Sequence, residues 1–250
     1  MELPKIYGAP LHLVVPAIVL SIVYVVLVVR FIRHMRGLGV TWSGKKHKTV
    51  LLLGPRNAGK TQLFHAVRDG EFVATVSSMK ELSSTFPVHP KYNADKFTAE
   101  LNVVDFPGHE RLRSRVSDFY PITGCIVFVI DASDSPMLRK AAEFLYDIFA
   151  NAKVNDLSPP MLVACNKSEV AGAMSPEAVR EALEKELTQL KTTRSSLDTE
   201  GEEQDLSVVP VGRDGAPFQF AVDAPCEVTF VKASVKNDSI KDVVAFMQKH

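Results

Sequence analysis

Eight consecutive residues, Gly54 to Thr61, combine glycine, lysine and threonine in an order that suits phosphate binding. They read Gly-Pro-Arg-Asn-Ala-Gly-Lys-Thr, between an apolar run that predicts a strand and a segment that predicts a helix. Glycines let backbone N–H groups turn toward an anion, the lysine can reach the β- and γ-phosphates, and the threonine hydroxyl can bind Mg²⁺. A plain strand-to-helix turn is the alternative, but the context predicts a nucleoside triphosphate site. The predicted phosphate-binding residues are Gly54, Pro55, Arg56, Asn57, Ala58, Gly59, Lys60, Thr61 and Gln62.

A second candidate residue, Asp105, ends a predicted strand and is followed by Phe-Pro-Gly-His. A carboxylate at a strand end beside the phosphate loop can hold Mg²⁺ through water. Gly108 can offer its N–H to the γ-phosphate with no side chain in the way. Asp and Gly are also ordinary turn residues, so the inference depends on their place after the phosphate loop. We therefore predict a metal site formed by Thr61 and, through water, Asp105.

Two later motifs predict a base-binding region. Asn166-Lys167-Ser168-Glu169 follows the predicted strand Met161–Cys165 and resembles the guanine-reading Asn-Lys-x-Asp of small GTPases, with Glu in the last place. A carboxylate there accepts hydrogen bonds from the guanine N1–H and exocyclic amine; a polar turn without a ligand is the alternative. Ser-Val-Lys follows the last predicted strand, where small GTPases place Ser-Ala-Lys against the base. The predicted base-binding residues are Asn166, Lys167, Glu169, Ser234, Val235 and Lys236.

The N-terminal region contains a candidate membrane span. Leu13 to Val29 is seventeen residues without a charge. As a helix it would be about 26 Å long, which suits a thin bilayer such as that of the endoplasmic reticulum. A cleaved signal peptide and a buried core helix are the alternatives; the basic residues that follow and the all-round apolar character favour a membrane anchor.

Charge around the span predicts its orientation. Lys5 is the only lysine or arginine before it, whereas three arginines and three lysines lie between Arg30 and Lys48. The positive-inside rule then places the N-terminus in the lumen and the rest of the chain in the cytosol. We expect a short lumenal N-terminus (1–10), a transmembrane helix (11–32), a basic cytosolic linker (33–48) and a GTPase-like domain (49–250).

The four motifs, in this order, resemble the Ras-like GTPase superfamily over roughly Thr49 to His250. A membrane span followed by a domain with Asp-x-Pro-Gly-His-Glu resembles, more narrowly, the signal recognition particle receptor beta subunit family. Glu169 and Val235 depart from the small-GTPase pattern, and both departures concern the base. The strings that carry the narrower resemblance are Asp105–Arg113 (DFPGHERLR), Cys165–Lys167, Leu183–Ser195 (LEKELTQLKTTRS) and the strand leading to Ser234–Lys236.

The resemblance implies a GTP- and Mg²⁺-binding subunit on the endoplasmic reticulum membrane. Such a subunit holds the receptor's alpha subunit, and through it the signal recognition particle and ribosome. The alpha subunit would cover two nucleotide-dependent segments, here Thr75–Ser84 (the first switch) and Phe106–Arg115 (the second switch). Segments ordered by a γ-phosphate form a common GTPase switch.

The resemblance leaves catalysis and one metal ligand open. His109 occupies the place where many GTPases carry a water-orienting glutamine. It either orients water or contacts protein, and we expect slow hydrolysis. In the first switch, Thr75, Val76, Ser77 and Ser78 align with the family's nucleotide-contacting string. Ser77 is the predicted Mg²⁺ ligand, ahead of Thr75, Ser83, Ser84 and Thr85; a plain Ser/Thr-rich loop is the alternative.

Strands and helices are expected to alternate after the anchor, which indicates an α/β fold: a mostly parallel central sheet with helices on both faces. Thr192–Pro217 is expected to be a polar insertion. The predicted strands are Thr49–Leu53, Phe86–His89, Phe97–Asp105, Cys125–Asp131, Met161–Asn166 and Glu227–Val231. The predicted helices are Thr61–Arg68, Pro136–Ala152, Ser175–Leu190 and Ser239–Lys249.

Composition limits the partners and the compartment. Lysine plus arginine and aspartate plus glutamate both number 29, so the formal net charge is zero, which argues against nucleic acid as a direct partner. The three cysteines, Cys125, Cys165 and Cys226, are consistent with buried thiols in a reducing compartment.

Three other functions remain open from the sequence. One is a membrane-tethered GTPase of the Arf or Sar kind in vesicle traffic, although residue 2 is Glu and excludes myristoylation. Another is a tether whose nucleotide does not turn over, which single-turnover hydrolysis would distinguish. The last is an adenine-using ATPase or kinase, which the identity of the bound nucleotide would distinguish.

Overall fold

The computed structural model describes residues 5–6, 9–10, 49–93, 100–197 and 207–250. The chain divides into two units, 1–45 and 46–250. In the first unit, β1 (Lys5–Ile6) and β2 (Ala9–Pro10) pair antiparallel. The predicted span Leu13–Val29 lies outside the described ranges, and within those ranges no helix has the length and apolar character needed to cross a membrane.

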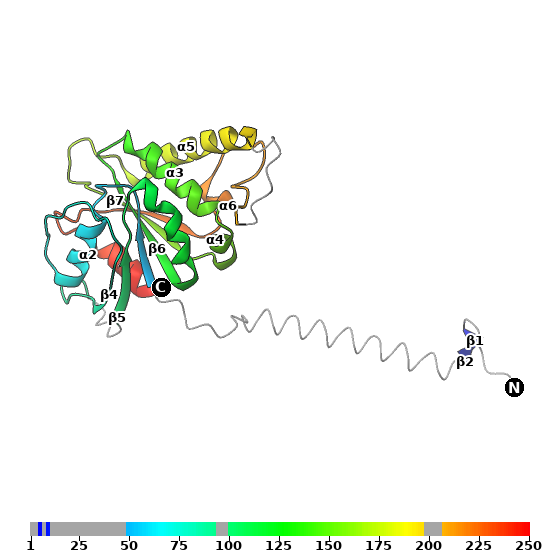
Figure 1. Cartoon of the computed structure of the whole chain (residues 1–250), viewed down its shortest axis with the longest axis horizontal. Coiled ribbons are helices and arrows are strands. Elements are labelled where there is room, and N and C mark those ends of the chain that lie inside the picture. Colours follow the sequence, from blue (N-terminus) through cyan, green and yellow to red (C-terminus); the bar gives the residue numbers. More distant parts are fainter. Residues whose placement is uncertain (1–4, 7–8, 11–48, 94–99, 198–206) are drawn as a thin grey trace. The chain divides into compact units, whose positions relative to one another are not determined.

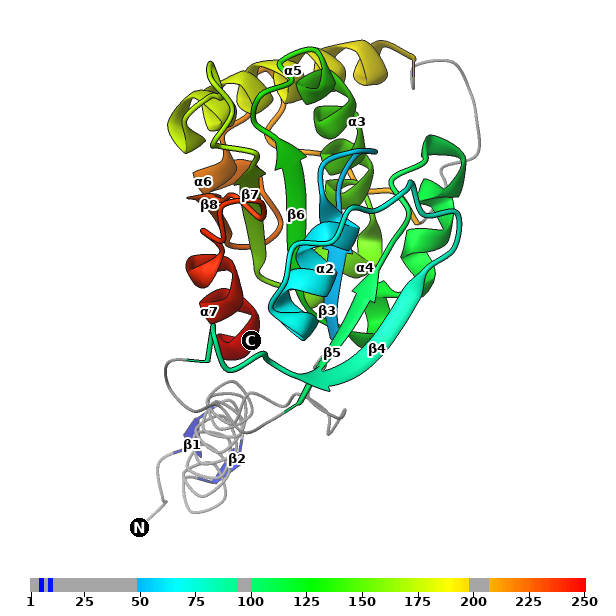
Figure 2. The same cartoon turned by 90° about the vertical axis from the view of Figure 1, so that its left-hand side faces the viewer.

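The second unit is built on a six-stranded sheet with the order β4-β5-β3-β6-β7-β8. Neighbouring strands run parallel throughout, except that β4 pairs antiparallel with β5. Figure 2 shows β4 at the outer edge of the sheet. The strands are β3 (Thr49–Leu53), β4 (Leu82–Pro87), β5 (Glu100–Asp105), β6 (Thr123–Asp131), β7 (Met161–Asn166) and β8 (Val228–Lys232).

The central strands are buried on both faces, as their continuous apolar sequence predicts. Successive side chains of β6 alternate between two cores: Ile126 and Phe128 belong to one, and Val127 and Val129 to the other. The strands β3 and β7 alternate in the same way, because strand side chains have a period of two.

Helices cover both faces of the sheet, which confirms the predicted α/β fold (Figure 1). Side chains of α2 and α7 contribute to one core, and those of α3, α4, α5 and α6 to the other. The helices are α2 (Lys60–Asp69), α3 (Met137–Phe149), α4 (Ala152–Leu157), α5 (Pro176–Leu197), α6 (Phe220–Asp223) and α7 (Lys241–Lys249). Two 3₁₀ helices, η1 (Glu110–Asp118) and η2 (Tyr120–Ile122), precede β6.

Several predicted bounds were wrong. The helix predicted to reach Ala152 ends at Phe149, and α4 begins after the N-cap Asn151, whose side chain accepts a hydrogen bond from the Lys153 N–H. The helix predicted to end at Leu190 continues to Leu197, inside the predicted insertion. The first switch was expected to be a loop to Ser84, but β4 begins at Leu82, because pairing with β5 stabilises an exposed edge strand that lacks apolar alternation.

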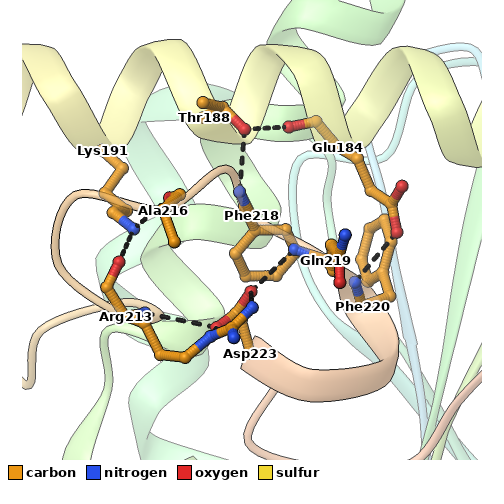
Figure 3. Close-up of polar contacts among 9 residues, drawn as sticks. All are labelled: Glu184, Thr188, Lys191, Arg213, Ala216, Phe218, Gln219, Phe220 and Asp223. Carbon is orange, nitrogen blue, oxygen red and sulfur yellow. Dashed lines mark hydrogen bonds and ion pairs between the residues drawn. The ribbon is translucent and has the colours of Figure 1, made fainter.

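The chain after residues 198–206 returns onto α5 through a set of polar contacts (Figure 3). Thr188 and Glu184 of α5 accept hydrogen bonds from the backbone N–H groups of Phe218 and Phe220. The two phenylalanine rings lie edge to face, 5.3 Å apart, within the core. Within the predicted insertion, the Val209 N–H donates to the Ala150 carbonyl at 2.7 Å and Arg213 pairs with Asp223 at 2.8 Å, so these residues contact the domain.

Candidate nucleotide-binding site

All four sequence motifs lie at the carboxyl ends of the parallel strands, the usual position of a ligand site in such a sheet. The phosphate loop leads from β3 into α2, and Asp105 ends β5. Asn166 ends β7, and Ser234 follows β8. Strand pairing alone therefore brings together residues that are far apart in sequence.

Gly59 shows why the phosphate loop requires glycine. Its φ of 97° lies in the left-handed region. A Cβ at this position would be 2.3 Å from the Asn166 Nδ2 atom. Gly59 is also the N-cap of α2, and it provides no side-chain cap, so the N–H groups of the first turn can bind an anion.

Lys60 is buried at the start of α2, where its Nζ donates to the carbonyl oxygens of Gly54 at 2.9 Å and Pro55 at 2.8 Å. Burial lowers the pKa of the Lys60 ammonium from 10.5 to about 8, although the charge on Asp105 opposes this shift. The phosphates of a nucleotide would compensate the buried positive charge.

Asp105 and Thr61 fit a Mg²⁺ site. The Thr61 hydroxyl donates to Asp105 Oδ2 at 2.5 Å, while Asp105 Oδ1 is buried and has no hydrogen-bond partner among the described residues. Burial raises the pKa of Asp105, against the lowering effects of Thr61 and Lys60. A buried carboxylate oxygen beside a hydroxyl is the donor set that a hard cation such as Mg²⁺ prefers. In the described part of the chain, no group of three or more His, Cys, Asp or Glu side chains is placed to hold a metal ion.

In the first switch, Ser78 contacts Thr61, whereas Ser77, the predicted Mg²⁺ ligand, contacts Asn57. The Ser78 Oγ lies 3.0 Å from the Thr61 Oγ1. Ser77 Oγ instead donates to Asn57 Oδ1 at a long 3.4 Å. Both serines line the cavity, but the contact with Thr61 is made by Ser78. The geometry therefore favours Ser78 as the switch hydroxyl nearest the metal.

Gly108 marks the close approach of the second switch to the phosphate loop. A Cβ at Gly108 would lie 2.6 Å from both Lys60 Nζ and the carbonyl carbon of Pro55. Gly108 and Lys60 border a cavity of about 230 Å³. Its lining consists of Arg56, Asn57, Gly59, Lys60, Thr61, Gln62, Thr75, Val76, Ser77, Ser78, Phe106, Pro107, Gly108 and Lys167.

Asn166 joins the phosphate loop to the base-binding region. Its Nδ2 donates to the Ala58 carbonyl at 2.8 Å, and its Oδ1 accepts from the Val235 N–H at 3.1 Å. Asn166 is buried, and both polar atoms of its side-chain amide are hydrogen-bonded to backbone groups of the protein. It therefore positions the two loops relative to each other.

Glu169 is held beside the last loop by the Ser234 hydroxyl, which donates to Glu169 Oε2 at 2.5 Å. The Asn237 N–H in turn donates to the Ser234 Oγ at 3.0 Å. Because Oε2 is held by Ser234, the orientation of the whole Glu169 carboxylate, including Oε1, is fixed. The arrangement brings the two predicted base motifs together.

Lys167 is fixed by a residue that the sequence analysis did not single out. Its Nζ lies 2.5 Å from Asp131 Oδ2 at the end of β6. Burial raises the pKa of Asp131, but hydrogen bonds from Lys167 and Ser133 outweigh it and hold that pKa below its usual value. Lys167 adopts a left-handed φ of 60°, and of the predicted base-binding residues it alone lines the cavity. Only the position of Asp131 at a buried strand end could have indicated this role.

His109 caps η1: its Nδ1 accepts a hydrogen bond from the Arg111 N–H at 3.2 Å. The residue is half-buried and does not border the cavity. This contact gives His109 a structural role, which favours the protein-contact alternative over orientation of water.

Comparisons with known proteins identify the family. A family model described as "Signal recognition particle receptor beta subunit" matches residues 45–224. The chain is 33% identical over 198 residues to the signal recognition particle receptor subunit beta of Mus musculus, covering 78% of this chain and 71% of the mouse protein. The chain belongs to the signal recognition particle receptor beta subunit family.

Solved structures agree with membership of the receptor beta subunit family. "The Structure of the Mammalian SRP Receptor" contains a chain that is 31% identical, with a TM-score of 0.66, over 80% of this chain and 98% of that one. "Signal recognition particle receptor SRb-GTP/SRX complex from Chaetomium thermophilum" matches with a TM-score of 0.60 and 21% identity, over 80% of this chain and 97% of that one, and this likeness supports the fold. The relatives also include ADP-ribosylation factors at 30% identity over 56% of this chain.

Proposed function

We propose that the chain is the membrane-anchored, GTP-binding subunit of a signal recognition particle receptor and recruits the alpha subunit to the endoplasmic reticulum for co-translational targeting. The observation that carries the proposal is an exposed apolar surface on the segment that also borders the phosphate cavity. Its members, which we call the switch surface, are Phe72, Val73, Val76, Met79 and Leu82.

The switch surface suits a protein partner. Val76 is 89% exposed and Met79 is 68% exposed. Several large apolar side chains exposed along one segment indicate a candidate interaction site. Ser78 lies between these residues in sequence and faces Thr61, so phosphate and metal contacts can order the surface.

The proposed nucleotide contacts follow from the site. Backbone N–H groups of the phosphate loop and Lys60 bind the β- and γ-phosphates, and Thr61, Asp105 through water, and Ser78 hold Mg²⁺. Bound Mg²⁺ supplies positive charge that neutralises the phosphates. Glu169 accepts hydrogen bonds from the guanine edge. Because His109 caps η1, we expect slow hydrolysis without the partner.

Recruitment of the alpha subunit is expected to depend on the switch surface. Val76→Asp and Met79→Asp should each lower capture of the alpha subunit by about tenfold or more, because a charge in an apolar contact costs at least about 1.4 kcal/mol. GTP affinity should stay within about twofold for Met79→Asp, because Met79 is not among the residues that line the cavity. Val76 does line it, so capture by Val76→Asp is measured at saturating GTP. Pull-down with GTP-loaded full-length chain measures the effect.

The matched control is Val222→Asp, an exposed valine (57%) on α6 outside the cavity lining. This variant should capture the alpha subunit as wild type does. Equal capture by all three variants would contradict the switch surface as the docking site. Equal capture by nucleotide-free and GTP-loaded chains would indicate a constitutive tether in place of a switch.

The proposed anchor has its own test. After alkaline carbonate extraction of membranes, the chain should remain in the pellet, because the seventeen-residue uncharged run needs a lipid environment. Protease added to intact microsomes should digest a C-terminal epitope, as the basic flank predicts a cytosolic domain. A fully protected epitope would contradict this orientation.

A further inference from the structure

The loop after β8 is a closed turn that presents Ser234 and Val235 to the base-binding region. Ser234 and Ser239 pair through two backbone hydrogen bonds of 3.0 and 2.8 Å. Within this turn, Asp238 has a φ of 61°, and its N–H donates to the Val235 carbonyl at 3.3 Å. Hydrogen bonds within the turn fix its shape. Its orientation relative to the sheet therefore depends on contacts with residues outside the turn.

Asp238 connects the turn to the segment that follows β4. Its Oδ1 accepts a hydrogen bond from the Tyr92 hydroxyl, and its Oδ2 lies 2.6 Å from Lys91 Nζ. Burial raises the pKa of Asp238, but the contacts with Lys91 and Tyr92 outweigh it and hold that pKa below the usual value, with a smaller contribution from Lys241. Both carboxylate oxygens therefore contact residues far earlier in the chain, Tyr92 and Lys91.

Tyr92 and Lys91 are well placed to serve as a fixed support. They follow the edge strand β4, and the Tyr92 N–H donates to the His89 carbonyl at 3.0 Å. The Tyr92 ring is buried in the same core as Ile240 and Val243. The segment itself is held to α2, because the His89 N–H donates to the Val67 carbonyl at 3.0 Å.

The same turn reaches the base-reading groups. Ser234 donates to Glu169, and the Val235 N–H donates to Asn166. A displacement of the turn would therefore shift the Glu169 carboxylate, whose position determines the hydrogen bonds to a guanine edge.

We propose that Tyr92 and Lys91, acting through Asp238, are positioning residues that orient the base-reading turn and lengthen the residence time of guanine nucleotide. The inference rests on the proposed nucleotide function and adds residues that no motif contains. It also links β4, which continues from the first switch, to the base-binding end of the site.

Release of fluorescent GDP from the purified full-length chain tests the proposal. Tyr92→Phe removes only the hydroxyl, and Asp238→Asn keeps a residue that tolerates positive φ. Each should speed release about fivefold, equivalent to about 1 kcal/mol. Tyr92→Phe removes the hydroxyl contact and Asp238→Asn removes the ion pair with Lys91, so the double variant should release GDP at least as fast as either single variant.

The ratio of IDP to GDP release rates distinguishes a positioning role of Tyr92 and Asp238 from a general loss of stability. IDP lacks the exocyclic amine that Glu169 is proposed to contact, so wild type should release IDP faster than GDP. In Tyr92→Phe and Asp238→Asn this ratio should shrink toward one. A merely structural defect would lower the melting temperature and speed release of both nucleotides equally, which would overturn the proposal.

Asp147→Asn is the matched control. Asp147 pairs with Arg194 at 3.0 Å with side-chain exposures of 40% and 42%, against 39% and 45% for Asp238 and Lys91. This change should leave release unaltered, and an equal acceleration would overturn the proposal. If wild type retains GDP and both test variants behave like it, only this inference fails. If wild type binds no guanine nucleotide, the proposed function fails, and the inference with it.

Discussion

Lys60→Met is expected to weaken GTP binding by about a hundredfold to ten-thousandfold. Charge-assisted hydrogen bonds contribute about 1.5–3 kcal/mol each, and Lys60 can make one to each of two phosphates. Isothermal titration with Mg²⁺-GTP measures the loss. Lys185→Met, at an exposed lysine of α5, is the control and should bind as wild type does.

The same substitution should stabilise the nucleotide-free chain. Burial lowers the pKa of Lys60 to about 8 from 10.5, so below pH 8 the folded state carries a buried ammonium at a cost of about 3 kcal/mol. Between pH 8 and 10.5 the unfolded state binds more protons than the folded state, so wild-type stability rises with pH there. Lys60→Met removes this pH-dependent difference.

Denaturant unfolding of both proteins at pH 7 and pH 10 checks this expectation. The advantage of Lys60→Met should be largest at pH 7 and should shrink at pH 10. A variant that retains wild-type GTP affinity would show that the phosphate-loop assignment is wrong. If Lys60→Met is less stable than wild type at pH 7, this would contradict the claim that the buried ammonium destabilises the folded chain, but not the phosphate-loop assignment.

Glu169→Ala is expected to weaken GTP binding by several kcal/mol and to leave any ATP binding unchanged. The carboxylate is proposed to accept two hydrogen bonds from guanine, each contributing about 1.5–3 kcal/mol. Adenine has no matching donor pair at that edge, which explains the expected selectivity. Glu169→Asp should keep the preference for GTP, because it retains the carboxylate.

Glu169→Gln gives a sharper comparison. Its amide can donate a hydrogen bond, so it should favour xanthosine triphosphate, which carries a carbonyl where guanine has its exocyclic amine. Glu143→Ala, at a half-buried glutamate of α3 outside the cavity lining, is the matched control and should change neither affinity. Unchanged GTP affinity in Glu169→Ala would show that Glu169 does not read the base.

Most of the sheet could be predicted from the sequence because buried parallel strands are continuous apolar runs. Cys125–Asp131 and Met161–Asn166 were expected as strands and lie within β6 and β7. The motifs lie at strand ends, so the meeting of the phosphate loop, Asp105 and Asn166 followed from the fold. The start of β4 could not be predicted, since its exposed Ser-Ser-Thr sequence becomes a strand only by pairing with β5.

The finer contacts of the site were beyond sequence reasoning. Ser77 and Ser78 are the same residue type, and only the path of the backbone determines which one faces Thr61. Tyr92 and Asp238 are 146 residues apart and belong to no motif, so their contact depends on the packing of α7 against the sheet. Local patterns predict elements and ligand chemistry, whereas tertiary packing determines which side chains meet.

The identity of the bound nucleotide tests the central claim most directly. The full-length chain would be purified in detergent with Mg²⁺, denatured, and its released nucleotide identified by mass spectrometry. The arrangement of Lys60, Asp105 and Glu169 predicts GDP or GTP at close to one per chain. Release of ADP or ATP would contradict the assignment of the base, and an empty chain that also fails to bind added GTP would contradict the proposed function.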